Sequence, residues 1–186
     1  IDPSRRNENE RVFKLADCAP NIVELQCDLF EVADQILVKT APLLDIKQAL
    51  NELKHVSKVV VISVNNDCKE VIYLLDKKNI GEPIVEAVNL GTVQQKFSFS
   101  YTNELEASPT YSEPLSYLYE PNSSILKAGA FNTIAHEIGL NKIAPNTHLY
   151  TSNELVEAFP GRTFKIEQVL PYQPKVFKKL GIKKAN

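Results

Sequence analysis

The chain contains no methionine and begins at Ile1. Without an initiator residue, it is predicted to be a piece of a longer polypeptide. No apolar run reaches the roughly 18 residues that a membrane-spanning helix needs, and no signal peptide is present. We therefore expect no membrane partner. The 186 residues, 44% of them hydrophobic and 24% charged, are enough for one or two small domains with real cores.

Cysteine is scarce, and charge is nearly balanced. The three cysteines lack CxxC spacing, which excludes a disulfide framework and a zinc site and predicts a metal-free protein of the reducing cytoplasm. The net charge of -2 provides no general attraction for a polyanion. One stretch differs, because Tyr172 to Asn186 carries five lysines and no acids. This stretch either follows a phosphate backbone or is a solvated tail. The lysines are Lys175, Lys178, Lys179, Lys183 and Lys184.

The first hundred residues predict helices and strands in alternation. Val56 to Val64 is apolar almost without interruption, which is typical of a strand buried on both faces of a parallel sheet. The spacing predicts an α/β sheet with crossover connections. Because the sheet would start at the tip of a strand, we expect an exposed edge and face where an upstream half belongs. The other predicted elements are helices at 22–33, 45–53 and 69–77, and strands at 35–39, 84–90 and 94–102.

A second unit is expected after a polar linker. The boundaries we assign are 1–104 for the first unit, 105–114 for the linker and 115–186 for a small α+β domain. Its predicted elements are strands at 115–120, 148–151 and 163–170, helices at 122–139 and 152–159, and a basic helix or tail at 174–184.

Two short segments follow strands, where open α/β sheets bind ligands. Asp2-Pro3 is a rigid turn that fixes a carboxylate, and Arg5 and Arg6 can clamp a phosphate or a base edge. The alternative is a purely structural turn. The second segment starts at Lys39 and includes Pro42 and Asp45, of which Asp45 can equally serve only as a helix N-cap. Cys18 precedes a helix instead of ending a strand, which argues against a nucleophilic cysteine.

Several motifs in the same order resemble one known family over nearly the whole chain. The segment 2–6 resembles the Asp-Pro-x-Arg variant of motif IV in class I S-adenosylmethionine-dependent methyltransferases, and 39–46 resembles the Lys-x-Ser-Pro-Met-Leu-Asp-Ile segment of one bacterial subgroup. That subgroup has a C-terminal THUMP-like domain, to which 118–121, 125–131, 147–152 and 159–162 are similar. Ala41 and Leu43 replace the Ser and Met of the motif, so no role of that Ser is carried over.

The resemblance implies the C-terminal half of a Rossmann-like methyltransferase sheet followed by a THUMP-like domain. Asp2, Pro3, Arg5 and Arg6 would border the methyl-transfer site, with Lys39, Pro42 and Asp45 as the opposite lip of the substrate site. The cofactor would be S-adenosylmethionine. Its Gly-rich loop is missing after any early strand, so we expect it upstream of Ile1 and expect this chain alone to be inactive.

The implied acceptor is RNA, recruited by the second domain. Lys127 and Arg162 can meet phosphates, and His148 and Tyr150 can lie beside unpaired bases. Each has a structural alternative, since His148 and Tyr150 can simply face a core or solvent and Arg162 can tie down a turn. Two other functions stay open: an RNA-binding or interaction module without activity, and a methyltransferase for a protein or small molecule.

Overall fold

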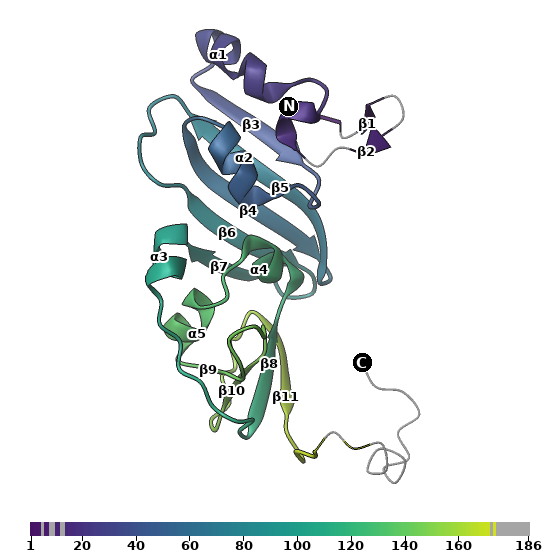
Figure 1. Cartoon of the computed structure of the whole chain (residues 1–186), viewed down its shortest axis with the longest axis vertical. Coiled ribbons are helices and arrows are strands. Elements are labelled where there is room, and N and C mark those ends of the chain that lie inside the picture. The colour runs from purple at the N-terminus through teal and green to yellow at the C-terminus, as the bar shows by residue number, and fades with distance from the viewer. Residues whose placement is uncertain (5, 8–9, 12–13, 172, 174–186) are drawn as a thin grey trace.

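Two β-sheets, one above the other along the long axis, form the molecule (Figure 1). The computed structural model describes residues 1–4, 6–7, 10–11, 14–171 and 173. A five-stranded sheet fills the N-terminal part and a four-stranded sheet the C-terminal part, with a short ribbon of β1 (Arg6–Asn7) and β2 (Glu10–Arg11) beside the first. The predicted mixture of α and β structure is confirmed. The lysine-rich segment 174–184 lies outside the described residues.

The five-stranded sheet has the order β3-β5-β4-β6-β7. Strands β4 and β6 are parallel, and the other neighbouring pairs are antiparallel. Since β5 is antiparallel to both β3 and β4, those two strands point the same way. The strands are β3 (Gln35–Thr40), β4 (Val56–Val64), β5 (Asp67–Asp76), β6 (Ile84–Leu90) and β7 (Gln95–Phe99).

Side-chain caps start the two helices that accompany this sheet. In α1 (Ile22–Val32), the Asn21 side chain accepts from the backbone amides of Val23 and Glu24 at 3.1 and 3.4 Å. In α2 (Ile46–Glu52), Asp45 accepts from the Gln48 amide at 2.7 Å. Both helices agree with the apolar periodicity, and the N-cap role of Asp45 is confirmed. A 3-10 turn, η1 (Leu15–Asp17), precedes α1.

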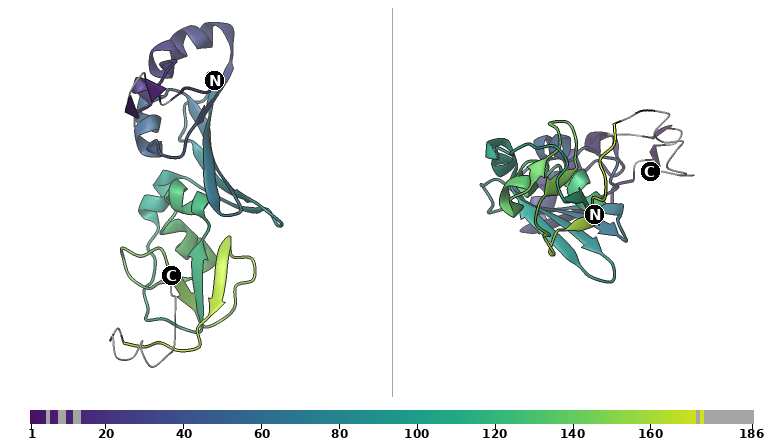
Figure 2. Two further views of the ribbon diagram at one scale, coloured as in Figure 1. Left: turned by 90° about the vertical axis from the view of Figure 1, so that its right-hand side faces the viewer. Right: turned by 90° about the horizontal axis from the view of Figure 1, so that it is seen from below.

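The large sheet has one covered face and one open face. Helices lie on a single side of it in the left view of Figure 2, and α4 (Ser123–Ala128) packs against β4, β5 and β6. On the other side, Leu37 and Ile84 are 51% and 47% exposed. The strand register places both apolar and charged side chains on this side, which we call the open sheet face. Its apolar members include Leu37, Val60, Ile62, Ile72, Leu74, Ile84 and Val88, and its charged members include Lys39, Lys58, Glu70, Glu86 and Lys96.

The helix predicted at 69–77 is wrong, because these residues form most of β5. A tight turn at Asn65 and Asn66, with φ of 50° and 65°, folds β5 back onto β4 as a hairpin. Cys68 also lies on this strand. Val71 and Tyr73 are buried while the intervening Ile72 is half-buried. Apolar residues on both faces hid the period of two.

The C-terminal sheet has the order β11-β8-β10-β9, with all neighbouring strands antiparallel. Three buried aromatic residues, Tyr119, Tyr150 and Phe159, pack together in its core. The strands are β8 (Tyr117–Pro121), β9 (Asn141–Lys142), β10 (Tyr150–Ser152) and β11 (Gly161–Lys165).

Two helix predictions in this part are corrected. The helix expected at 122–139 is two, α4 and α5 (Thr133–Ile138), because Gly129 adopts a left-handed φ of 84° and ends the first. The helix expected at 152–159 is absent. There the Tyr119 hydroxyl donates to the Glu154 carbonyl at 2.9 Å and accepts from the Val156 amide at 3.0 Å. These side-chain bonds satisfy the backbone groups without helical turns.

Hydrogen bonds join the two parts of the molecule. The Ser123 amide donates to Asn66 Oδ1 at 2.7 Å, from the start of α4 to the β4–β5 turn. The Gln95 side chain of β7 donates to the carbonyls of Phe159 and Gly161 at 3.4 and 3.3 Å. Between the sheets, α3 (Tyr101–Glu106) extends into the segment expected to be a linker.

Candidate functional site

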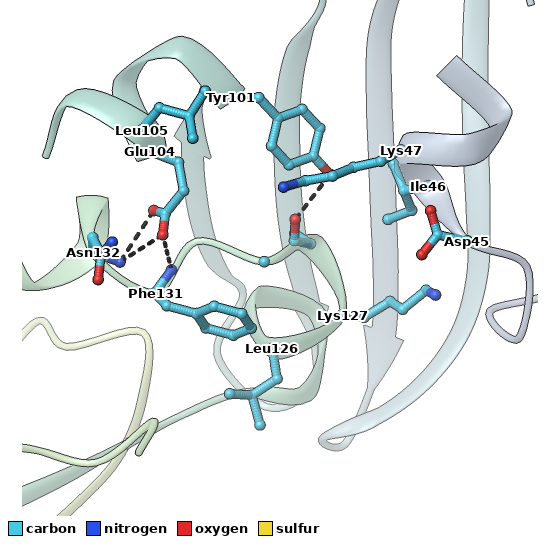
Figure 3. A pocket seen from close by; sticks show the side chains of 12 residues that line it. Asp45, Ile46, Lys47, Tyr101, Glu104, Leu105, Leu126, Lys127, Phe131 and Asn132 are labelled. Atoms are coloured by element: carbon cyan, nitrogen blue, oxygen red, sulfur yellow. Dashed lines mark hydrogen bonds between the residues drawn. The ribbon is translucent and has the colours of Figure 1, made fainter. Parts of the chain in front are cut away.

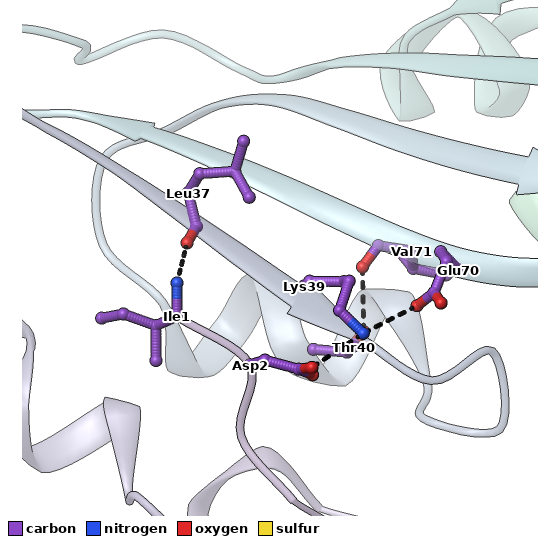
Figure 4. A network of polar contacts seen from close by, with 7 residues as sticks. All are labelled: Ile1, Asp2, Leu37, Lys39, Thr40, Glu70 and Val71. Carbon is purple, nitrogen blue, oxygen red and sulfur yellow. Dashed lines mark hydrogen bonds and ion pairs between the residues drawn. The ribbon is translucent and has the colours of Figure 1, made fainter.

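An ion-paired lysine joins two of the predicted site residues at the end of β3. Lys39 Nζ lies 2.9 Å from Asp2 Oδ2 and 3.4 Å from Glu70 Oε2 of β5 (Figure 4). The hydrogen bond with Asp2 is the largest cause that raises the pKa of Lys39 above its ordinary value of 10.5. The structure thus brings together Asp2 and Lys39, which are far apart in the sequence.

Ile1 lies along the outer edge of β3. Its amino group donates to the Leu37 carbonyl at 2.7 Å, and its carbonyl accepts from the Lys39 amide at 2.9 Å (Figure 4). This is the bonding pattern of parallel neighbours, with Ile1 opposite Val38. Asp2 and the loop after β3 therefore follow parallel segments at the same edge of the sheet.

The neighbouring residues of the Asp-Pro segment contribute mainly to packing. Pro3 is buried, and the backbone of Ser4 pairs with Ala19. Arg5 lies outside the described residues, and for Arg6 the structure describes the backbone, in β1. The predicted clamp formed by the two arginines stays a prediction.

The loop after β3 meets the C-terminal part of the chain. Pro42 is half-buried in this loop. The Lys127 ammonium, on α4, donates to the carbonyl of Leu44 at 2.8 Å. A residue predicted for the substrate site of the second unit therefore touches the loop predicted for the substrate site of the first.

A pocket of about 400 Å³ opens beside this contact (Figure 3). Its walls come from α2, which accompanies the first sheet, from α3 between the sheets, and from α4 and the start of α5. We therefore call it the inter-sheet pocket. Asp45 and Lys127, both predicted for substrate binding, line it together. The other lining residues are Ile46, Lys47, Tyr101, Glu104, Leu105, Leu126, Ala128, Gly129, Phe131 and Asn132.

Two lysines, Lys47 and Lys127, line this pocket together with the carboxylates of Asp45 and Glu104. Burial is the largest cause that lowers the pKa of Lys127 below 10.5, and the nearby Asp45 opposes it. Lys47 Nζ lies 5.0 Å from the centre of the Tyr101 ring, within reach of a cation–π contact. The Tyr101 hydroxyl donates to the Ala128 carbonyl at 3.0 Å, which fixes the ring in the wall.

Glu104 fixes the opposite wall. It is buried, and its carboxylate accepts from the amides of Phe131, Asn132 and Thr133 at 2.8 to 3.1 Å and from the Thr133 hydroxyl at 2.8 Å. These donors lie at the start of α5, where backbone amides lack helical partners. Figure 3 shows the Glu104 carboxylate pointing at Phe131 and Asn132.

Phe131 links the pocket to two more of the predicted residues. The exposed His148 stacks on its ring, with centroids 3.8 Å apart and planes at 18°. Partial desolvation of the ring, followed by the charge of Lys142, lowers the pKa of His148 below 6.5. Tyr150 is 0% exposed, and its hydroxyl donates to the Phe131 carbonyl at 2.9 Å. Tyr150 thus occupies the core and supports the pocket wall from behind.

Arg162 lies away from this cluster, on β11. Its Nε donates to Glu120 Oε2 at 3.0 Å across to β8, directly opposite in the register. The pairing agrees with the structural alternative stated for this residue, and its side chain is still 59% exposed.

The sequence prediction missed Lys47, Tyr101, Glu104 and Phe131. Lys47 directly follows the Asp45–Ile46 cap, and a cap alone does not indicate a pocket. Glu104 lay at the edge of the presumed linker. Nothing near Glu104 in the sequence indicates its contacts, because its partners Phe131 and Thr133 lie 27 and 29 residues away.

Among the residues that the structure describes, no group of three or more His, Cys, Asp or Glu could hold a metal ion. Within the same residues, no helix has the length and apolar character needed to cross a membrane. Cys18 is buried, and its thiol donates to the Lys14 carbonyl at 3.5 Å.

A glycine-rich loop after an early strand would hold S-adenosylmethionine on an open α/β sheet. The residues of this chain do not form such a loop. The first 80 residues contain no glycine, so the loops at the end of β3 lack the close backbone approach that such a cradle needs. What this edge offers instead is the Lys39-paired carboxylate of Asp2, a group suited to orienting a neighbouring hydrogen-bond donor.

Comparisons with known proteins address both sheets. Residues 117–160 match the model of a ferredoxin-like domain family. The chain is similar to a crystal structure from Porphyromonas gingivalis W83 described as a "putative methyltransferase", with 37% sequence identity and a TM-score of 0.87. The match covers 96% of this chain and 45% of that one, so the chain spans less than half of its length. No curated protein matches the chain. The chain therefore shares its fold with part of that structure, across both sheets.

Proposed function

We propose that this chain is the acceptor side of an S-adenosylmethionine-dependent methyltransferase that modifies RNA. The observation that carries the proposal is the Asp2–Lys39 pair, 2.9 Å apart at the edge where two parallel segments end. Open α/β sheets bind their ligands at such an edge. The similarity to the Porphyromonas gingivalis structure supports methyl transfer as the reaction class.

In this proposal, the chain's residues position the acceptor. Asp2, held by Lys39, orients a hydrogen-bond donor of the acceptor base, and the Pro42–Asp45 loop forms the opposite lip. Arg5 and Arg6 lie next to Asp2 in the sequence and would contact the phosphate. Holding the acceptor in a reactive geometry can supply a large part of a rate enhancement.

An upstream part of the same polypeptide would bind the cofactor in this proposal. Two features of the sheet support such a partner. The open sheet face has exposed or half-buried apolar side chains on several strands, beside the ion-paired Lys58, Glu86 and Lys96, and exposed apolar patches mark interaction sites. The outer edge of β3 already accepts parallel pairing from Ile1 and has unpaired backbone groups that a longer strand would use.

RNA as acceptor and a THUMP-like role of the C-terminal domain both come from the family resemblance. The ferredoxin-like match at 117–160 describes a small α+β unit and is compatible with that role. The proposed location is the cytoplasm, in keeping with three cysteines that lack CxxC spacing.

The test uses the complete polypeptide and S-adenosylmethionine labelled on its methyl group, offered with separate pools of RNA, DNA and protein. We expect label in RNA. Label in DNA or protein alone would overturn the RNA assignment. No label in any pool, with cofactor binding demonstrated, would instead favour a small-molecule acceptor or a module that binds without catalysis.

A variant tests the role of the edge itself. Asp2→Asn removes the charge that pairs with Lys39 and should lower turnover by at least about tenfold with cofactor affinity unchanged. Asp28→Asn, at an exposed position of α1, is the matched control and should leave turnover intact. Equal turnover in the two variants would remove Asp2 from the site.

A further inference from the structure

Helix α4 is fixed at both of its ends on the covered face of the large sheet. It packs against β4, β5 and β6. At its start, the Ser123 amide donates to Asn66 Oδ1 at 2.7 Å. At its end, the Ala128 carbonyl accepts from the Tyr101 hydroxyl at 3.0 Å. By sequence α4 lies within the ferredoxin-like match at 117–160, so a unit of the C-terminal part presents its side chains at a defined place on the first sheet.

The Lys127 side chain extends from this helix to the loop after β3. We call residues 41–45 the lip loop, because the proposed function assigns Pro42 and Asp45 to the lip of the acceptor site. The Lys127 ammonium donates to the Leu44 carbonyl at 2.8 Å. Leu44 is only 1% exposed, so little water can reach its carbonyl to replace the ammonium.

The opposing charge of Lys127 lies on the same loop. Lys127 is half-buried, and desolvation is the largest cause that lowers its pKa, while the charge of Asp45 raises it. Figure 3 shows Lys127 and Asp45 on the same side of the inter-sheet pocket. A partly desolvated ammonium is stable only with hydrogen-bond acceptors and opposite charge around it. The lip loop supplies both.

Two short-range hydrogen bonds shape the lip loop from within. The Leu44 amide donates to the Ala41 carbonyl at 3.2 Å, which closes a turn. The Asp45 carboxylate accepts from the Gln48 amide at 2.7 Å and caps α2. Each of these bonds joins residues three positions apart, so both act locally. The bond from Lys127 spans 83 positions and attaches the loop to α4.

We propose that Lys127 is a positioning residue, whose ammonium holds the lip loop against α4 and thereby links the ferredoxin-like unit to the acceptor site. This proposal rests on the proposed function, which gives the lip loop its place beside the acceptor. Turnover depends on holding the acceptor in a reactive geometry, so a loosened lip loop lowers turnover while RNA and cofactor still bind.

Lys77 provides a matched control. Its ammonium donates to the Phe30 carbonyl at 2.7 Å, a long-range bond of the same type. Lys77 follows β5, whose last residue pairs with the first residue of β3. Lys77→Met therefore removes an ammonium–carbonyl bond at the opposite end of β3 from the lip loop. Lys127→Arg is the conservative variant, because it retains a cation at position 127.

Hydrogen–deuterium exchange of the complete polypeptide measures the lip loop without any substrate. Lys127→Met should speed exchange of the Leu44 amide about tenfold, the effect of one lost charged hydrogen bond on a local opening. Lys127→Arg should stay near the parent rate, and Lys77→Met should leave the Leu44 amide as it is in the parent. Unchanged exchange of this amide in Lys127→Met would overturn the proposal.

Methyl transfer and RNA affinity are measured separately on the same variants. Lys127→Met should lower kcat by about tenfold or more, with the KM for S-adenosylmethionine and the affinity for RNA near the parent values. Lys127→Arg should recover most of the lost kcat, and Lys77→Met should keep the parent value. Weaker RNA binding with a flatter salt dependence in Lys127→Met would overturn the proposal in favour of a phosphate contact.

This proposal and the proposed function fail in different ways. A parent protein that transfers no methyl group to RNA would remove the proposed function and the role of Lys127 with it. A parent that methylates RNA, with Lys127→Met equally active despite faster exchange in the lip loop, would remove the role of Lys127 alone.

Discussion

The Nζ of Lys39 lies 2.9 Å from the Oδ2 of Asp2, across the edge between Ile1 and β3. This contact is the main cause of the raised pKa of Lys39. A raised pKa means that the stabilising contribution is complete below pH 10.5 and is lost as the pH rises through the folded-state pKa. Asp2→Asn should move the pKa of Lys39 down towards 10.5, measured by NMR of labelled lysine side chains. Asp28→Asn should leave it in place.

Glu104 is predicted to be a major determinant of local stability. Glu104→Ala leaves the Thr133 hydroxyl and three backbone amides without their acceptor in a buried position. We expect a loss of about 2–4 kcal/mol in the free energy of unfolding, measured by urea denaturation. Glu106→Ala, at an exposed position of the same helix, should change it by less than about 0.5 kcal/mol. Similar losses in the two variants would contradict the role of Glu104.

Gly161 is required by a close approach of two strands. A Cβ at this position would lie 2.1 Å from the Glu120 carbonyl oxygen and 2.8 Å from the Pro121 Cα, both backbone atoms. Gly161→Ala should therefore separate β11 from β8 and lower the unfolding free energy by about 3 kcal/mol or more.

Gly129→Ala is the comparison for Gly161. A Cβ added at Gly129 would have no atom within 4 Å. The loss of stability therefore comes only from the left-handed φ of 84° and is about 1 kcal/mol. Thermal unfolding of both variants should show a larger loss of stability in Gly161→Ala than in Gly129→Ala. A milder effect at Gly161 than at Gly129 would contradict the steric explanation.

His148 should make stability depend on pH near neutrality. Partial desolvation and the charge of Lys142 lower its pKa below 6.5, so the folded protein binds this proton less readily than the unfolded chain. The contribution to stability is complete above pH 6.5 and is lost as the pH falls through the folded-state pKa. Urea titrations between pH 5 and 8 should show this loss in the parent chain, and His148→Asn should reduce it. An identical pH dependence in both proteins would show that another group is responsible.

Local signals in the sequence were sufficient for elements that carry caps and a clear period. The helix at 22–32 was predicted from the helical spacing of Ile22, Leu25, Leu29 and Val32. The structure has the helix, but it buries Ile22, Gln26 and Phe30 and leaves Leu25 and Val32 exposed. The strand at 56–64 is marked by its β-branched run, and the N-cap at Asp45 by its position. In each case, side chains within a few residues determine the backbone conformation.

Errors arose where distant contacts override local preference. The segment 69–76 has apolar residues at spacings that also suit a helix, and pairing with β3 and β4 on both sides makes it a strand. The segment 152–159 has a favourable cap, and the hydroxyl of Tyr119 takes its backbone groups instead. Neither partner can be identified from the segment itself.

The same division applies to the candidate site. The sequence by itself marked Asp2 and Lys39 as candidates near the ends of strands, and marked Asp45 and Lys127 as separate candidates in two units. Only the tertiary structure decided that Lys127 reaches the loop after β3 and that Tyr101, Glu104 and Phe131 complete a pocket there. Leu44 and Lys127, 83 positions apart, meet beside this pocket because α4 packs against the first sheet, and the sequence carries no local signal of that packing.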